Sequence, residues 1–217
     1  YEFAGPAISE LSMEERMTIC NMSIEGGARC GYINPDEKTF SYMKDKLCSP
    51  QNENWEKAVK WWKSLESSDN CIYDDVFKLD ASKVEPTITW GITPGQSIGV
   101  NQKIPSLNEI HPNDQFIAEE AYEYMGFKPG QSIKNTPIDV CFIGSCTNGR
   151  ISDLRVAAQV LEHNKVAKNI KAFVVPGSEK VAKEAKEEGL DKIFIKAGFQ
   201  WREPGCSMCL AMNSDKL

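Results

Sequence analysis

The chain has 217 residues, of which 41% are hydrophobic and 26% are charged, a balance typical of a globular protein with room for one large domain or two modest ones. Its 25 basic and 31 acidic residues give a net charge of −6, and no basic tract is present, so neither nucleic acid nor an anionic membrane surface is expected as a partner. No apolar run approaches the roughly 20 residues of a membrane-spanning helix.

The first part of the chain is predicted to be helical. Residues 8–30 carry apolar side chains at helical spacing, and Ser12 followed by Glu15 has the sequence of a capping box. A second, short helix is predicted from Asp36 onward, and a third over residues 54–64.

A stretch broken repeatedly by proline and glycine follows. Within residues 69–114 only 84–90 reads as extended, and we interpret the stretch as a connection between two lobes. The predicted lobes are residues 1–100, a helical or αβ lobe, and residues 101–217, an α/β lobe that carries the cysteine motifs described below.

The second lobe alternates predicted strands with predicted helices. The strands are residues 138–143, 171–175 and 192–195, and the helices are residues 116–125, 151–163 and 179–188. Strand–helix–strand repeats of this length are typical of a parallel sheet covered by helices. The predicted fold class is therefore α/β, with parallel sheet layers covered by helices in two lobes.

Three of the eight cysteines follow predicted strands. Cys146 stands in Gly-Ser-Cys-Thr-Asn after residues 138–143, and Cys206 and Cys209 form a Cys-x-x-Cys pair after residues 192–195. Because ligands bind beyond the carboxyl ends of parallel strands, the three thiols are expected to meet in space. Thiolates suit iron–sulfur clusters and zinc, and a set of three leaves one metal position open for a substrate.

Two other interpretations of the motifs stay open at this point. A structural zinc site would need a fourth ligand, and the only histidines, His111 and His163, are interpreted as surface residues. A redox dithiol made of Cys206 and Cys209 would need a thiolate of lowered pKa. The remaining cysteines are interpreted as small buried hydrophobic residues: Cys20, Cys30, Cys48, Cys71 and Cys141.

The cysteine motifs and several other phrases together resemble one family. The matching phrases are residues 2–5, 12–22, 25–29, 35–37, 88–91, 142–150 and 201–213. They are similar to the large subunits of isopropylmalate dehydratases, a branch of the aconitase superfamily, and the resemblance runs nearly from end to end.

The resemblance implies a [4Fe–4S] cluster held by Cys146, Cys206 and Cys209, whose fourth iron binds substrate. The implied reaction is that of a hydro-lyase in leucine biosynthesis, which isomerises 2-isopropylmalate and 3-isopropylmalate by dehydration and rehydration. Asn21 and Glu25 match polar active-site positions of the superfamily and, four residues apart, are expected to share one helix face. Homoaconitase-type or aconitase-type substrates are the alternative within the family.

The resemblance also implies partners and missing parts. A small partner subunit supplies the catalytic serine of this branch, and further active-site residues of the relatives have no counterpart in this sequence. The chain is therefore interpreted as an internal fragment that is inactive alone. Arg150, directly after the cluster loop, is interpreted as a surface or capping residue, with contact to an anionic substrate as the alternative. The expected location is the bacterial cytoplasm, with an organelle as the alternative.

Overall fold

The structure, a computed structural model, describes residues 1–210. Contacts divide the chain into two compact units, one made of residues 1–68 with 138 onwards and the other of residues 69–137. This division differs from the predicted lobes, because residue 100 falls inside the second unit and the first unit joins two distant stretches. The lobes over residues 1–100 and 101–217 stay a prediction.

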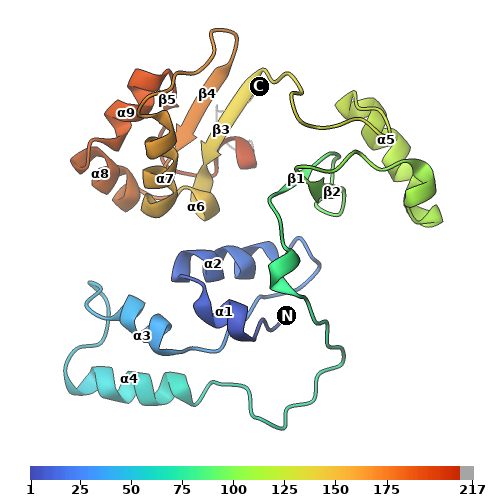
Figure 1. Ribbon diagram of the computed structural model, residues 1–217. Coiled ribbons are helices and arrows are strands. Elements are labelled where there is room, and N and C mark those ends of the chain that lie inside the picture. The colour runs from blue at the N-terminus through green and yellow to red at the C-terminus, as the bar shows by residue number, and fades with distance from the viewer. Residues whose placement is uncertain (211–217) are drawn as a thin grey trace. The chain divides into compact units, whose positions relative to one another are not determined.

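A three-stranded parallel sheet lies in the part of the first unit made of residues 138–210 (Figure 1). Its strands are β3 (Val140–Gly144), β4 (Lys171–Val175) and β5 (Gln200–Trp201), in the order β3-β4-β5. β3 pairs with β4 along its whole length, and β4 pairs with β5 over two residues. The predicted α/β class with a parallel sheet is confirmed.

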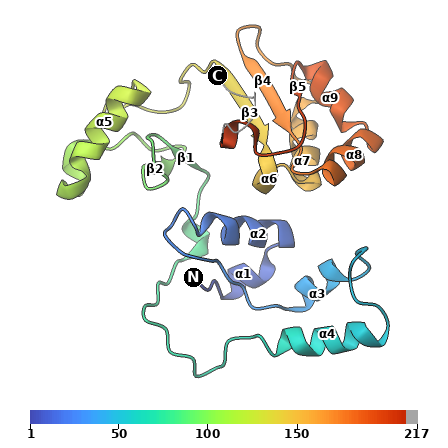
Figure 2. The same cartoon turned by 180° about the vertical axis from the view of Figure 1, so that it is seen from behind.

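Three helices pack on this sheet: α7 (Ile151–Leu161), α8 (Glu179–Glu187) and α9 (Leu190–Ala197). Both crossovers, β3 to β4 and β4 to β5, run in the same direction along the sheet, and right-handed crossovers of that kind place their helices on one face. The views from front and back agree with this arrangement (Figures 1 and 2). The core between them contains Leu154, Val174, Ala185 and Phe194, all without exposed surface.

The predicted third strand is wrong, because residues 192–195 lie within α9. The apolar run around Phe194 is short enough to pass for a buried strand when only its hydrophobicity is read. In the structure Leu190, Phe194 and Ala197 are buried at helical spacing, and Gly198, with a φ of 105°, ends the helix in the left-handed conformation. The third strand is β5, which begins only two residues later.

The second unit has its own small core and is therefore more than a connection. A hairpin of β1 (Thr87–Thr89) and β2 (Ser97–Gly99) precedes helix α5 (Gln115–Met125). Trp90 stacks on Tyr122 of α5 with ring centroids 5.2 Å apart, and Ile104 is buried beside them. The extended residues predicted over 84–90 contain β1, and α5 agrees with the helix predicted over 116–125, whereas β2 was not predicted.

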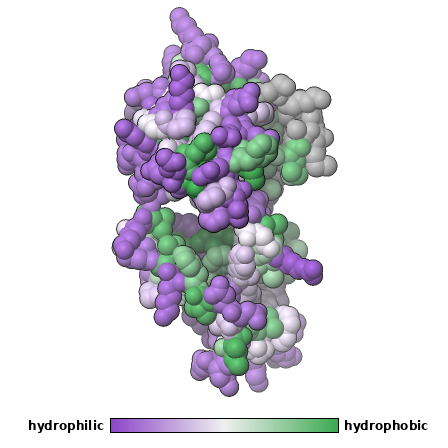
Figure 3. Space-filling model, turned by 90° about the vertical axis from the view of Figure 1, so that its right-hand side faces the viewer, coloured by the Kyte–Doolittle hydropathy of each residue, from purple (hydrophilic) through white to green (hydrophobic). Residues whose placement is uncertain are grey.

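Many large apolar side chains remain on the surface of the described residues. Leu47, Ile72 and Phe77 are 100%, 95% and 85% exposed. The face shown in Figure 3 carries apolar residues among hydrophilic ones. No helix within residues 1–210 is long and apolar enough to cross a membrane.

The N-terminal part of the first unit contains four helices: α1 (Pro6–Glu10), α2 (Met13–Met22), α3 (Glu37–Met43) and α4 (Glu53–Lys63). A single helix over residues 8–30 is therefore wrong. Leu11 is extended, and Ser12 begins α2 with the predicted capping box, its hydroxyl accepting from the Glu15 N–H while the Ser12 N–H donates to the Glu15 carboxylate. Helix α2 ends at Met22 and does not continue to residue 30, because Gly26 and Gly27 follow closely and glycine is a poor helix former.

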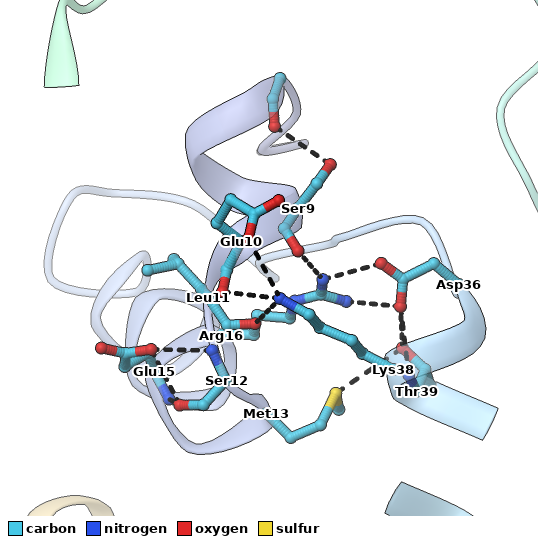
Figure 4. Close-up of polar contacts among 11 residues, drawn as sticks. Ser9, Glu10, Leu11, Ser12, Met13, Glu15, Arg16, Asp36, Lys38 and Thr39 are labelled. Carbon is cyan, nitrogen blue, oxygen red and sulfur yellow. Dashed lines mark hydrogen bonds and ion pairs between the residues drawn. The ribbon is translucent and has the colours of Figure 1, made fainter. Parts of the chain in front are cut away.

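An ion pair between a buried arginine and a partly exposed aspartate joins α2 to the start of α3 (Figure 4). Arg16, only 3% exposed, donates to both carboxylate oxygens of Asp36 at 2.7 Å and to the carbonyl of Ser9 at 2.9 Å. Asp36 also caps α3 by accepting from the Thr39 N–H at 3.1 Å. The Arg16 guanidinium, bonded to this carboxylate, is the main cause that lowers the pKa of Asp36 from 3.8 to about 2.

Candidate metal centre

Cys146 lies on the turn that follows β3. The strand ends at Gly144, and the next four residues form the short helix α6 (Ser145–Asn148). Gly144 has a φ of 124°, and a Cβ there would collide with the Val175 carbonyl at the end of β4. Only glycine allows the backbone to turn this closely against the neighbouring strand, and the turn presents Cys146 as an exposed side chain.

The loop after β4 packs against the Cys146 turn. The Gly177 N–H donates to the Gly149 carbonyl at 2.7 Å, and a Cβ on Gly149 would lie 2.5 Å from the Ser145 carbonyl oxygen. Glycine at both positions therefore lets the ends of β3 and β4 meet backbone to backbone, as expected at the carboxyl edge of a parallel sheet.

Cys206 and Cys209 follow β5 and reach the same edge. The Arg202 N–H donates to the Val174 carbonyl at 3.0 Å, which keeps the chain beside β4 beyond the end of the strand. Cys206 is half-buried and Cys209 exposed. Desolvation raises the pKa of Cys206, and the thiols of Cys146 and then Cys209 raise it further, so the Cys206 thiol has both of the other predicted ligands as neighbours.

Two buried serines beside these cysteines adopt an unusual backbone conformation. Ser145, next to Cys146, has a φ of 71°, and Ser207, next to Cys206, has a φ of 47°. Their exposed fractions are 6% and 2%. A left-handed conformation outside glycine costs roughly 1–2 kcal/mol and persists where surrounding structure enforces it, often at functional sites. Sequence patterns gave no sign of these two residues, because serine is unremarkable in a loop.

Helix α2 packs on the Cys146 loop. Arg150 donates from Nη1 to the Glu14 carbonyl at 3.0 Å and to the Thr18 hydroxyl at 2.9 Å, and the Thr18 hydroxyl lies 3.4 Å from Asn148 Oδ1. Arg150 also occupies the N-cap position of α7, but its side chain makes no cap hydrogen bond and reaches α2 instead. Thr18 and Glu14 were missed by sequence reasoning, because their partners lie 130 or more residues away.

The structure separates the two predicted catalytic residues. Asn21 lies in the last turn of α2, three residues after Thr18 and hence beside it on the helix surface. Glu25 lies in the turn after α2 has ended, so the helix face that the two were expected to share does not exist. Both side chains are exposed, and their catalytic roles stay a prediction.

Cys146, Cys206 and Cys209 form a soft donor set at one edge of the sheet. Among residues 1–210, no group of three or more His, Cys, Asp or Glu side chains could hold a metal ion as the side chains stand. Thiolates suit iron–sulfur clusters and zinc alike, so these three cysteines are the residues that could hold either group.

The whole chain, residues 1–217, matches the aconitase family (aconitate hydratase). The chain belongs to the aconitase family. Over its full length this aconitase-family chain is 99% identical to the 3-isopropylmalate dehydratase large subunit of Prochlorococcus marinus subsp. pastoris (strain CCMP1986 / NIES-2087 / MED4). It is 88% identical to the large subunit of Prochlorococcus marinus (strain MIT 9515) and 64% identical to that of strain NATL1A.

The aconitase-family chain spans 46% of the length of each of these relatives. The family predicted from the cysteine phrases is confirmed by these matches. The last three residues of the phrase over 201–213 lie outside the described residues, so the structure describes that phrase only as far as residue 210.

Proposed function

We propose that this chain is the cluster-binding part of a 3-isopropylmalate dehydratase large subunit, an iron–sulfur hydro-lyase. The observation that carries the proposal is the approach of Cys206 to Cys146 and Cys209 at the carboxyl edge of the sheet, in a chain of the aconitase family. The names of the relatives favour isopropylmalate over a homoaconitase-type or aconitase-type substrate.

A bound [4Fe–4S] cluster would supply a Lewis-acid iron that makes hydroxide a better leaving group during dehydration. Cys146, Cys206 and Cys209 would hold it, and the exposure of Cys146 and Cys209 leaves one side of the site open to substrate. Asn21, on the helix that packs against the Cys146 loop, offers an amide that donates hydrogen bonds to a substrate hydroxyl or carboxylate. Glu25 offers a carboxylate for proton transfer from the turn after that helix.

The proposal includes a partner. The relatives are named large subunits, and the matching small subunit would complete the site with its catalytic serine. Large apolar side chains such as Leu47, Ile72 and Phe77 are almost fully exposed, and contact with other protein, either the rest of the large subunit or the small one, would cover them. Turnover of 2-isopropylmalate is expected only when these parts are present, and turnover by the 217-residue chain alone would contradict this assignment of parts.

The proposal is tested by anaerobic reconstitution with iron and sulfide. About four irons per chain and visible absorption are expected, both lost in Cys146→Ser, Cys206→Ser and Cys209→Ser. Cys48→Ser is the matched control, because Cys48 is an exposed free cysteine outside the three-thiol group. Full iron and sulfide in Cys146→Ser would refute the ligand set, and one zinc per chain without sulfide would favour the structural zinc module.

A further inference from the structure

A hydrogen-bond network joins the cluster loop, which is residues 145–150 after β3 and carries Cys146, to helix α2, which lies far earlier in the sequence. Arg150 Nη1 donates to the Glu14 carbonyl and to the Thr18 hydroxyl, at 3.0 and 2.9 Å. The single hydroxyl hydrogen of Thr18 has two acceptors in reach, the Glu14 carbonyl at 3.1 Å and Asn148 Oδ1 at 3.4 Å. One cation thus bridges two acceptors on consecutive turns of α2, and the bridging hydroxyl reaches back to the loop.

The main chain around Arg150 is fixed independently of its side chain. The Arg150 N–H donates to Asp153 Oδ2 at 2.9 Å and so begins α7, and Gly149 is bonded to Gly177 on the next loop. The guanidinium therefore projects from a fixed base. Because bonds to a charged donor are roughly twice as strong as neutral ones, the half-buried Arg150 side chain makes a stronger tie between the cluster loop and α2 than the neutral Thr18–Asn148 contact does.

We propose that Arg150, acting with Thr18, is a positioning residue that clamps α2 against the cluster loop. The clamp sets the distance between Asn21, one turn beyond Thr18 on the same helix, and the cluster held through Cys146. The guanidinium is thereby assigned to α2 and not to an anionic substrate. This inference rests on the proposed function for its consequence, while the clamp itself is a property of the cluster-free chain.

The clamp is tested first without a cluster, by amide hydrogen exchange of the 217-residue chain. Arg150→Met and Thr18→Val are expected to raise the amide exchange rates of residues 14–22 and 145–150 by about 10-fold or more. This factor corresponds to the local stability lost when one or two hydrogen bonds to a charged group are removed. Thr18→Ser keeps the hydroxyl and is expected to exchange like the wild type, and Arg150→Lys, with one ammonium in place of a planar fork, to fall between. Arg155→Met is the control, since Arg155 lies on α7 but pairs with Glu184 and Glu188.

A second measurement follows the reconstituted cluster in air. The visible absorption of the cluster is expected to decay several-fold faster in Arg150→Met and Thr18→Val than in Thr18→Ser and Arg155→Met. Amide exchange rates in Arg150→Met equal to those in Arg155→Met would overturn the clamp. If circular dichroism shows that Arg150→Met does not fold, Thr18→Val is compared with Thr18→Ser, and equal exchange rates in these two variants would overturn the clamp. A wild-type chain that takes up no iron would refute the proposed function, while its exchange pattern still decides the clamp.

Discussion

Replacing Asp36 by Asn removes the negative charge that faces the buried Arg16 and leaves the shape of the side chain nearly unchanged. Asn caps helices about as well as Asp, so the bond from the Thr39 N–H to the α3 cap is expected to survive. The substitution therefore isolates the ion pair between α2 and α3 from the helix cap.

The magnitude follows from the pKa and from exposure. A fall in the pKa of Asp36 from 3.8 to about 2 corresponds to about 2 kcal/mol, at roughly 1.4 kcal/mol for each pKa unit. The Asp36 side chain is 39% exposed, so solvent screening reduces this contribution to roughly 1–2 kcal/mol. Arg16 is only 3% exposed, and leaving it without a carboxylate adds to the loss. We expect Asp36→Asn to lower the free energy of unfolding by about 2 kcal/mol at pH 7, a large part of the 5–15 kcal/mol of a typical domain.

The pH dependence has a definite sign. The folded pKa of Asp36 lies below its ordinary value, so the carboxylate stabilises the fold fully above pH 3.8, and this contribution is lost as the pH falls from 3.8 through about 2. About half of the pKa-derived contribution remains at pH 3. Urea unfolding at pH 7 and pH 3 measures the difference between wild type and Asp36→Asn, which is expected to shrink at the lower pH.

The matched control is Glu37→Gln on the neighbouring residue. Glu37 pairs with Lys63 at 3.0 Å, but both side chains are largely exposed, so a loss under about 1 kcal/mol is expected. An Asp36→Asn loss no larger than that of Glu37→Gln, or one that stays constant between pH 7 and pH 3, would refute the reasoning.

Three further predictions concern the cap of α2, the cluster turn and a surface ion pair. Ser12→Ala removes the capping box and is expected to lower stability by about 1 kcal/mol, measured by urea unfolding, with Ser12→Thr close to wild type. Gly144→Ala collides with the β4 carbonyl and is expected to cost more than about 2 kcal/mol and to abolish iron uptake, whereas Gly189→Ala, with a positive φ but open space, costs about 1 kcal/mol; equal losses would contradict the packing of the turn. Arg155→Met breaks exposed pairs and is expected to cost under about 1 kcal/mol, less in high salt, and a loss above about 2 kcal/mol would contradict their exposure.

Local patterns in the sequence predicted several elements because short-range physics decides them. The capping box at Ser12 and the helix predicted over 116–125 depend on neighbours three or four residues away, and the strands around Cys141 and Phe173 depend on continuous apolar runs. The prediction of a strand over residues 192–195 was wrong for the same reason, because an apolar segment of four residues fits a strand as well as a buried helix turn.

The sequence by itself determined the α/β class, because hydrophobic periodicity depends on local residue order, and its residue types and spacing singled out Cys146, Cys206 and Cys209 as candidate ligands. Only the tertiary structure decided which distant segments share a unit, that β5 and not residues 192–195 leads to Cys206, and that α2 is held on the cluster loop by Arg150. The physical reason is the same in each case: these features depend on contacts between residues far apart along the chain, and no local pattern records which side chain lies opposite.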